Sequence, residues 1–87
     1  MISVNFHRRF EKKLRRLNAK QQERFFERLR LFQNDPYHDI LDNHPLKGKL
    51  KGYRSIDVAG DLRAIYKEDS PWLAIFVDVG THSQLYG

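Results

Sequence analysis

Apolar residues change their spacing along the chain, and this change constrains the fold more than any other feature. In the first third they recur every three or four residues, which places them on one face of a helix. From Tyr53 onward they alternate with polar residues, which is typical of strands. The chain therefore combines helices with a sheet. The two helical stripes are Phe6, Phe10, Leu14 and Leu17, followed by Phe25, Leu29 and Phe32.

Local signals predict where the two helices begin and end. Asn5 offers a side-chain oxygen to the free N–H groups of a first helix, as an N-cap does. Asn18, with Gln21 three residues later, resembles a capping box that starts a second helix. The Asn-Asp-Pro run at 34–36 ends that helix, because proline lacks an N–H and pushes the preceding residue out of the helical region. The first third is thus a predicted helical hairpin, and residues 37–46 form a loop with a short helical turn.

Three strands are predicted in the second half, at residues 53–58, 62–67 and 72–79, with turns at 59–61 and 68–71. We expect a single α+β domain over residues 1–87, in which the helical hairpin packs on one face of a small antiparallel-rich sheet. In the last strand, alternation predicts a shared side for Leu73, Ile75, Val77 and Val79, and the opposite side for Trp72, Ala74, Phe76 and Asp78.

The size and composition of the chain limit what it can do. With 87 residues and no cysteine, there is room for one small core and no disulfide framework. Most apolar residues are needed in that core, so we expect any chemistry to lie on an open face. The basic N-terminal segment does not resemble a signal peptide, and no apolar run is long enough to span a membrane. We therefore expect a cytoplasmic protein that has no membrane partner.

The positive charge is concentrated in two regions. The chain has a net charge of +5, with ten Lys or Arg against three Glu in residues 1–33, and five against two Asp in residues 44–63. This pattern indicates a polyanionic partner, although solvated faces that keep a small protein soluble would give the same pattern.

Several kinds of chemistry are excluded by missing motifs. The chain has no Walker-type loop, GxGxxG, HExxH or GxSxG. His38 and His44 lack a third ligand nearby, so we expect no metal site, and we expect no cofactor. What remains is a polar constellation in the C-terminal half, made of His44, Lys47, Lys49, Lys51, Arg54, Asp57, Asp61, Arg63, His82 and Tyr86.

These residue types suit cleavage of RNA by attack of a 2′-hydroxyl on its own phosphate. The reaction needs a proton acceptor, a proton donor for the leaving 5′-oxygen, and cations for the phosphate oxygens. Imidazole moves protons near neutral pH. Arg63 is suited to gripping the phosphate, and the lysines at 47, 49 and 51, together with Arg54, are predicted to bind the flanking RNA backbone. Tyr86 or Trp72 can stack on a splayed base.

Four ordered motifs resemble the RelE/ParE superfamily of toxins from bacterial toxin–antitoxin systems, and within it the YafQ-like branch. They are His44-Pro45-Leu46-Lys47-Gly48, Lys51-Gly52-Tyr53-Arg54, Gly60-Asp61-Leu62-Arg63-Ala64-Ile65-Tyr66-Lys67 and Gly80-Thr81-His82-Ser83-Gln84-Leu85-Tyr86-Gly87.

The resemblance implies a ribosome-dependent mRNA endonuclease that a cognate antitoxin wraps and inhibits. It implies that His82, in the GTH motif, is the general acid. It also assigns site roles to His44, to Asp61 in the turn and to the terminal aromatic Tyr86, while Arg63 matches the strand arginine that RelE toxins use on the phosphate.

The sequence departs from the YafQ pattern at two positions. Asp57 stands where the pattern has a second histidine, and Asp78 stands where it has an arginine. Our hypothesis is that Arg63 supplies the missing cation. Asp57 then acts as the base or orients a neighbour, and Asp78 is structural.

Each assignment has a structural alternative. His82 can simply cap the end of the last strand, and Arg63 can be a strand arginine paired to Asp57 or Asp61. The lysines at 47, 49 and 51 alternate with other residues, so they also fit a charged strand edge. Tyr86 and Trp72 also fit core or edge fillers, and Trp72 fits that role better because it lies beside the turn at Pro71.

Two other functions share this fold and charge pattern. A ParE-like protein would inhibit DNA gyrase by binding alone, without an acid–base histidine. A non-cleaving RNA-binding module would use only the basic helices. We favour mRNA cleavage because His82 lies in the GTH motif.

Overall fold

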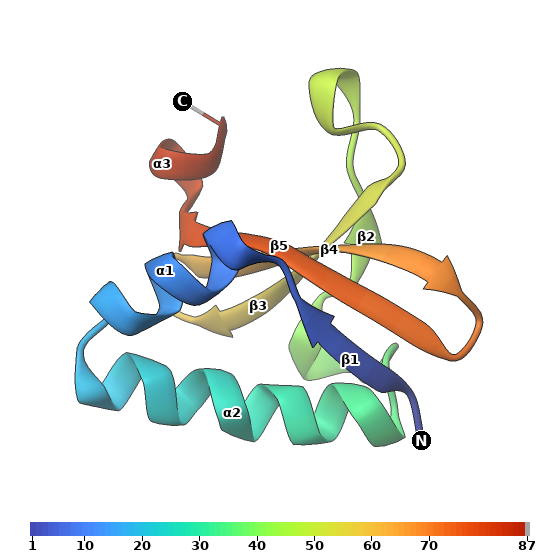
Figure 1. Ribbon diagram of the computed structural model, residues 1–87, viewed down its shortest axis with the longest axis horizontal. Helices are drawn as coiled ribbons and strands as arrows, with labels where there is room; N and C mark the ends of the chain where they lie inside the picture. Colours follow the sequence, from blue (N-terminus) through green and yellow to red (C-terminus); the bar gives the residue numbers. More distant parts are fainter. Residues whose placement is uncertain (87) are drawn as a thin grey trace.

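A five-stranded sheet forms the centre of the fold, and two helices cover one of its faces. The computed structural model describes residues 1–86. The strand order is β1-β5-β4-β3-β2, with β1 parallel to β5 and the other pairs antiparallel (Figure 1). The helices are α1 (Arg8–Arg16), α2 (Ala19–Asn34) and α3 (His82–Tyr86); the strands are β1 (Ser3–Phe6), β2 (His44–Pro45), β3 (Tyr53–Ala59), β4 (Leu62–Ser70) and β5 (Leu73–Thr81); the 3-10 turns are η1 (Asp39–Leu41) and η2 (Gly48–Leu50). The predicted α+β fold is confirmed.

The first helix begins later than its sequence signals predict. The predicted N-cap at Asn5 is wrong, and so is the place of Phe6 in the helical stripe, because both residues lie in β1. Their backbone pairs with β5, a partner 70 positions away that local signals cannot reveal. The N-cap is His7, whose Nδ1 accepts a hydrogen bond from the Arg9 N–H at 3.1 Å.

The second helix agrees closely with the prediction. Asn18 Oδ1 accepts from the Gln21 N–H at 2.8 Å, and Gln21 Oε1 accepts from the Asn18 N–H at 3.1 Å. These bonds form the expected capping box and satisfy two N–H groups that the helix leaves free. The helix ends at Asn34, before Pro36, as predicted.

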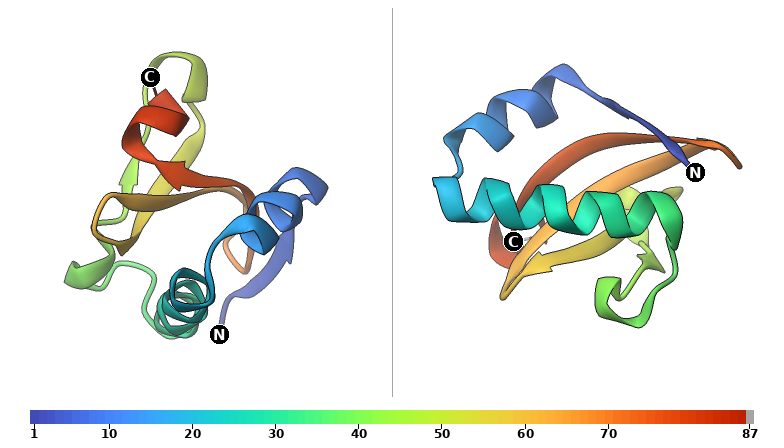
Figure 2. Two further views of the ribbon diagram at one scale, coloured as in Figure 1. Left: turned by 90° about the vertical axis from the view of Figure 1, so that its left-hand side faces the viewer. Right: turned by 90° about the horizontal axis from the view of Figure 1, so that it is seen from below.

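Aromatic rings fill the space between the helices and the sheet. Phe10, Phe25, Phe32 and Phe76 are at most 1% exposed, and their ring centroids lie 5.2–5.8 Å from a neighbour in the group. Tyr66 continues the group at 5.3 Å from Phe76. Figure 2 shows α1 and α2 lying on the same side of the sheet. This aromatic core joins the helices to β4 and β5, and so fixes the strands that carry the site.

A β-bulge in β5 changes which of its residues face the core, so part of the predicted assignment of faces is wrong. Tyr66 pairs with Phe76, but the preceding Ile65 pairs with Asp78, so one residue of β5, Val77, is extra. The strand changes phase there, and Val79 joins Phe76 in the core instead of facing away from it. Its predicted place beside Leu73, Ile75 and Val77 is therefore wrong. Asp78 likewise leaves the side of Ala74 and Phe76.

Two further predictions about the strands are corrected. The predicted turn at 68–71 is shorter, because β4 continues to Ser70. The segment with the three lysines forms the turn η2 instead of an alternating strand edge, so the strand-edge alternative is wrong.

The sheet face opposite α2 carries two projecting segments. The η2 segment and α3 both rise from this face in Figure 1. Between them lies the surface on which the candidate site is built. No helix among residues 1–86 is long and apolar enough to cross a membrane.

Candidate functional site

An open cleft with a volume of about 350 Å³ lies between α3, β4 and the segment that joins β2 to η2. It gathers four of the polar residues in which the sequence analysis placed acid–base chemistry or phosphate binding. Its lining consists of His44, Leu46, Lys47, Arg63, His82 and Tyr86. A substrate in this cleft would meet two imidazoles, a guanidinium and an ammonium group.

The first turn of α3 explains the spacing of the GTHSQ motif. The Thr81 N–H donates to Gln84 Oε1 at 2.8 Å, and the Gln84 N–H donates to Thr81 Oγ1 at 3.3 Å. These bonds form a capping box that starts α3 immediately after β5. At Gly80, an added Cβ would lie 2.9 Å from Gln84 Oε1, so glycine leaves room for the capping side chain. The motif thereby fixes the direction in which His82 leaves the sheet.

His82 and Tyr86 lie one helical turn apart on α3. Their ring centroids are 4.7 Å apart and their planes are inclined at 61°. This edge-to-face contact is a favourable arrangement for aromatic rings and limits the rotation of the imidazole. Tyr86 therefore positions His82 as well as lining the cleft.

His44 enters the cleft from β2 with a defined tautomer. Its Nδ1 lies 2.7 Å from the backbone oxygen of Asp42. A carbonyl oxygen only accepts hydrogen bonds, so Nδ1 must carry the proton. In neutral His44 the lone pair is then on Nε2. This is the arrangement that a general base needs.

Arg63 and Asp57 form an ion pair beside the cleft. They face each other across β3 and β4, and Arg63 Nη1 donates to Asp57 Oδ1. Partial burial raises the pKa of Asp57 above its usual range, while the Arg63 charge opposes that rise. The carboxylate is engaged with the guanidinium and does not line the cleft, an arrangement that suits orientation of Arg63.

Other residues singled out in the sequence lie elsewhere. Asp61 is exposed in the turn between β3 and β4, and Lys51 is exposed just beyond η2. Lys49 lines a neighbouring cleft. Arg54 Nε donates to Asn43 Oδ1 at 2.8 Å, and its guanidinium lies 5.3 Å from the centroid of the Tyr37 ring.

Trp72 and Asp78 also take positions that decide between earlier alternatives. Trp72 lies in the turn between β4 and β5 and is 73% exposed, so it does not fill the core; of the two filler positions that the sequence predicted, only the edge position remains. Asp78 accepts a hydrogen bond from Lys13 Nζ at 2.6 Å and one from the Val79 N–H at 2.9 Å. It therefore ties α1 to β5.

Some residues that build the site were missed in the sequence. Thr81 and Gln84 carry a recognisable T-x-x-Q spacing, which a search for capping boxes would have found. Asn43 has no such signal; its Nδ2 donates to the Pro36 oxygen and to the Tyr66 hydroxyl, both at 2.8 Å. Within residues 1–86, no group of three or more His, Cys, Asp or Glu side chains is placed to hold a metal ion.

Comparison with known proteins gives the family. The family described as "Bacterial toxin of type II toxin-antitoxin system, YafQ" matches residues 2–87. The mRNA interferase toxin YafQ of Escherichia coli (strain K12) is 40% identical over 52 residues, which are 60% of this chain and 55% of that protein. The match therefore spans about half the length of this curated relative.

Two solved structures are similar over their whole length. The crystal structure of YafQ from E. coli strain BL21(DE3) has a TM-score of 0.82 and 25% identity, with 100% of both chains covered. The YafQ chain in the E. coli DinJ-YafQ complex has a TM-score of 0.71 and 28% identity, again with 100% of both chains covered. The resemblance predicted from the motifs is thus confirmed. Since the family match includes nearly every residue, the chain belongs to the YafQ family of bacterial toxins of type II toxin–antitoxin systems.

Proposed function

We propose that this protein is a ribosome-dependent mRNA endonuclease. The observation that carries the proposal is the open cleft that holds His44, His82 and Arg63 together. A similar protein is named an mRNA interferase toxin, which agrees with this chemistry. An open cleft also suits a substrate that is itself held by a large particle.

The proposed reaction begins at His44. Its Nε2 takes the proton of the 2′-hydroxyl, whose oxygen attacks the adjacent phosphorus. His82, in its protonated form, gives a proton to the 5′-oxygen as the bond between phosphorus and that oxygen breaks. The products are a 2′,3′-cyclic phosphate and a 5′-hydroxyl, and no metal or cofactor is required.

Arg63 stabilises the charge that develops on the phosphate oxygens. Its guanidinium has five N–H donors, so the bond to Asp57 leaves others for the substrate. We assign Asp57 the role of orienting Arg63. Asp61 is two residues before Arg63, in the turn, and we propose that it acts on the substrate from the rim. Tyr86 holds the His82 ring and offers a face for a base.

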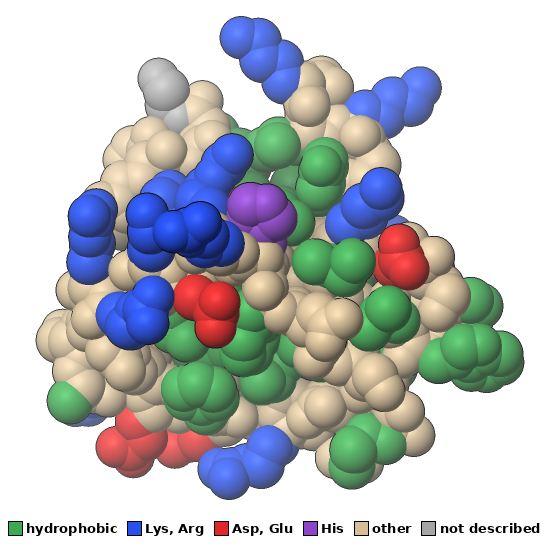
Figure 3. Space-filling model, in the orientation of Figure 1, with side chains coloured by type: hydrophobic (Ala, Val, Ile, Leu, Met, Phe, Trp, Pro, Cys, Tyr) green, Lys and Arg blue, Asp and Glu red, His purple; other side chains and the backbone are tan. Residues whose placement is uncertain are grey.

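The proposed contacts with the RNA backbone come from the lysines at 47, 49 and 51. Lys47 lines the cleft, while Lys49 and Lys51 lie within and just after η2. Figure 3 shows Lys and Arg side chains gathered at this projecting segment and over α1. We leave Arg54 out of this track, because it is engaged with Asn43 and Tyr37.

We further propose that a cognate antitoxin neutralises the toxin in the cytoplasm, where ribosomes are found. A relative has been crystallised with DinJ, as the DinJ-YafQ complex. The basic N-terminal third of this chain suits an acidic, partly disordered segment that folds as it binds. Titration with the protein encoded beside this one should give a tight complex.

Primer extension on a translated message tests the cleavage. We expect His82→Ala and His44→Ala each to lower the cleavage rate about 10²- to 10⁴-fold, the usual contribution of general acid–base catalysis. His38→Asn is the matched control. His38 lies outside the cleft and caps η1 through its Nδ1, and asparagine keeps a capping oxygen.

The outcomes separate the three functions. Wild-type cleavage rates in both cleft variants would refute the mechanism. Toxicity that persists in His82→Ala without cut message would favour the gyrase inhibitor. RNA binding that weakens with salt, and no cut message from the wild-type protein, would favour the non-cleaving module.

A further inference from the structure

A second cleft, with a volume of about 290 Å³, lies on the same side of the sheet as the first. Both clefts are walled by residues 46–50, which lead from β2 through η2, and by α3. Lys47 and His82 line the first, whereas Lys49 and Leu85 line the second. The two clefts are therefore neighbouring parts of one surface between the same two segments.

The second cleft has an apolar floor and a basic rim. The floor and walls come from β3, β4, β5, η2 and α3, and the rim comes from the start of α1 and from η2. Its lining consists of His7, Arg9, Lys49, Leu50, Tyr53, Ile65, Val77, Asp78 and Leu85. The carboxylate of Asp78 receives hydrogen bonds from Lys13 Nζ and the Val79 N–H, so its negative charge is balanced by a lysine.

Two arginines occupy the first turn of α1, where they oppose the helix dipole. Positive charge near a helix N-terminus is unfavourable, because the helix dipole places partial positive charge there. Arg8 and Arg9 are both exposed, and no described carboxylate pairs with either of them. Arg9 lines the second cleft, and Arg8 does not. Arg9 therefore does not stabilise the helix, and its exposed charge lies where a ligand in the second cleft would meet it.

His7 adds a directed hydrogen-bond donor. Its Nδ1 accepts the Arg9 N–H, so in the neutral ring the proton is on Nε2. This is the opposite tautomer to that of His44. The second cleft thus offers an imidazole N–H together with two cations, all of which suit an electronegative ligand.

We propose that the second cleft binds the nucleotide that flanks the cleaved phosphate. Its base packs on the floor against Tyr53, and its phosphate lies against Arg9 and Lys49. This inference rests on the proposed nuclease function and adds to it a binding site that contributes to the choice of cleavage site. Charge complementarity and the shared walls of the two clefts support a continuous RNA strand as the occupant.

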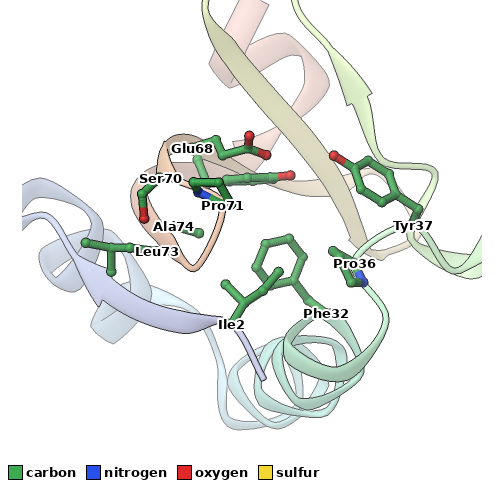
Figure 4. A pocket seen from close by; sticks show the side chains of 10 residues that line it. Ile2, Phe32, Pro36, Tyr37, Glu68, Ser70, Pro71, Leu73 and Ala74 are labelled. Carbon is green, nitrogen blue, oxygen red and sulfur yellow. The ribbon is translucent and has the colours of Figure 1, made fainter.

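The cavity in Figure 4 offers a contrast. It has a volume of about 250 Å³ and lies between the end of α2 and the hairpin of β4 and β5. Its lining includes the Glu68 carboxylate and no Lys or Arg, so it would repel a phosphate. Of the second cleft and the cavity in Figure 4, only the second cleft is lined by the positive charges that a nucleotide phosphate requires.

Arginine substitutions at adjacent positions give a matched test. Arg9→Ala and Arg8→Ala remove the same charge from the same turn, and neither is expected to weaken the helix because both arginines oppose its dipole. The assay is cleavage of a message on programmed ribosomes, with kcat and KM measured separately and the cut sites mapped by primer extension.

We expect Arg9→Ala and Lys49→Ala each to raise KM about fivefold, as for an exposed charge contact of about 1 kcal/mol, with kcat changed less than about twofold. Arg8→Ala should leave both constants unchanged. Tyr53→Leu, which keeps an apolar side chain but removes the ring, should change the distribution of cut sites.

Several results would overturn the inference. If Arg8→Ala and Arg9→Ala raised KM equally, Arg9 would act only through the overall positive charge of the protein and not through a nucleotide site. A weaker antitoxin complex with unchanged KM would assign the cleft to the antitoxin instead.

A measurement of ribosome binding distinguishes a failure of this inference from a failure of the proposed function. His82→Ala protein, which should not cut, is titrated against programmed ribosomes with and without Arg9→Ala. If wild-type protein cuts nothing but Arg9→Ala still weakens binding, the nuclease proposal fails and the nucleotide site stands. If the protein neither cuts nor binds, both fail.

Discussion

Replacing Gly80 with alanine should separate activity from stability. Gly80 is buried at the end of β5, and an alanine Cβ there would lie 2.9 Å from Gln84 Oε1 and 3.3 Å from Gln84 Cβ. The flexible end of Gln84 can move away, but it then gives up its hydrogen bond from the Thr81 N–H. The start of α3 would lose its capping box, and His82 would move with it.

The expected change in stability is small. A lost hydrogen bond costs about 0.5–1.5 kcal/mol of unfolding free energy. Replacing glycine by alanine lowers the entropy of the unfolded chain and so raises the unfolding free energy by about 0.4–1 kcal/mol. The two effects nearly cancel, so the urea midpoint should change little. Cleavage should fall about 100-fold, because a displacement of about 1 Å of a catalytic group has that effect on rate.

Urea unfolding and ribosome-programmed cleavage, measured on the same preparation, check this prediction. Gln84→Ala alone removes the capping side chain, so adding Gly80→Ala to it should cost less activity than Gly80→Ala costs in the wild-type background. Wild-type cleavage by Gly80→Ala would refute the reasoning. A loss of activity that simply follows the fraction of unfolded protein would refute it equally.

Two further predictions concern the core and the ion pair. Phe76→Ala should lower the unfolding free energy by about 3–5 kcal/mol, because the Phe76 ring is fully buried. The aromatic rings that surround it belong to Phe6, Phe10, Phe25, Phe32 and Tyr66. A loss below about 1 kcal/mol in urea unfolding would contradict this packing. Because burial raises the pKa of Asp57 above its ordinary value of 3.8, the folded protein binds this proton more tightly than the unfolded chain does. The stability that proton binding contributes is therefore lost as pH rises from 3.8 through the folded pKa. Asp57→Asn should remove that loss, and parallel urea midpoints for both proteins across the acid range would disprove the shift.

Local signals predicted the parts of the fold that depend on neighbouring residues. Asn18 and Gln21 start α2 through bonds that span three positions, so their sequence spacing is sufficient to find them. Phe6 was misplaced because its strand pairing depends on β5, far along the chain. The bulge at Val77 was equally invisible, since alternation in one strand does not reveal the register of its partner.

The site was predictable where it follows a motif and not where it depends on packing. The motifs placed His44, Arg63, His82 and Tyr86 in one candidate site, and they line one cleft. The Asp57–Arg63 pair was foreseen as an alternative, because alternation placed both on neighbouring strands. The engagement of Arg54 with Asn43 depends on how a loop folds back, and no short-range pattern records that.

The parallel pairing of β1 with β5 has a consequence for folding during synthesis. The residues of β1 leave the ribosome well before their partner strand, which begins at Leu73 and is made 70 positions later. Such long-range pairing is slow to form because most of the chain must be closed into a loop first. In the nascent chain, the N–H and C=O groups of β1 that later bond to β5 therefore have no strand partner. The helices that follow β1 cannot pack fully until the hairpin of β4 and β5 has been synthesised.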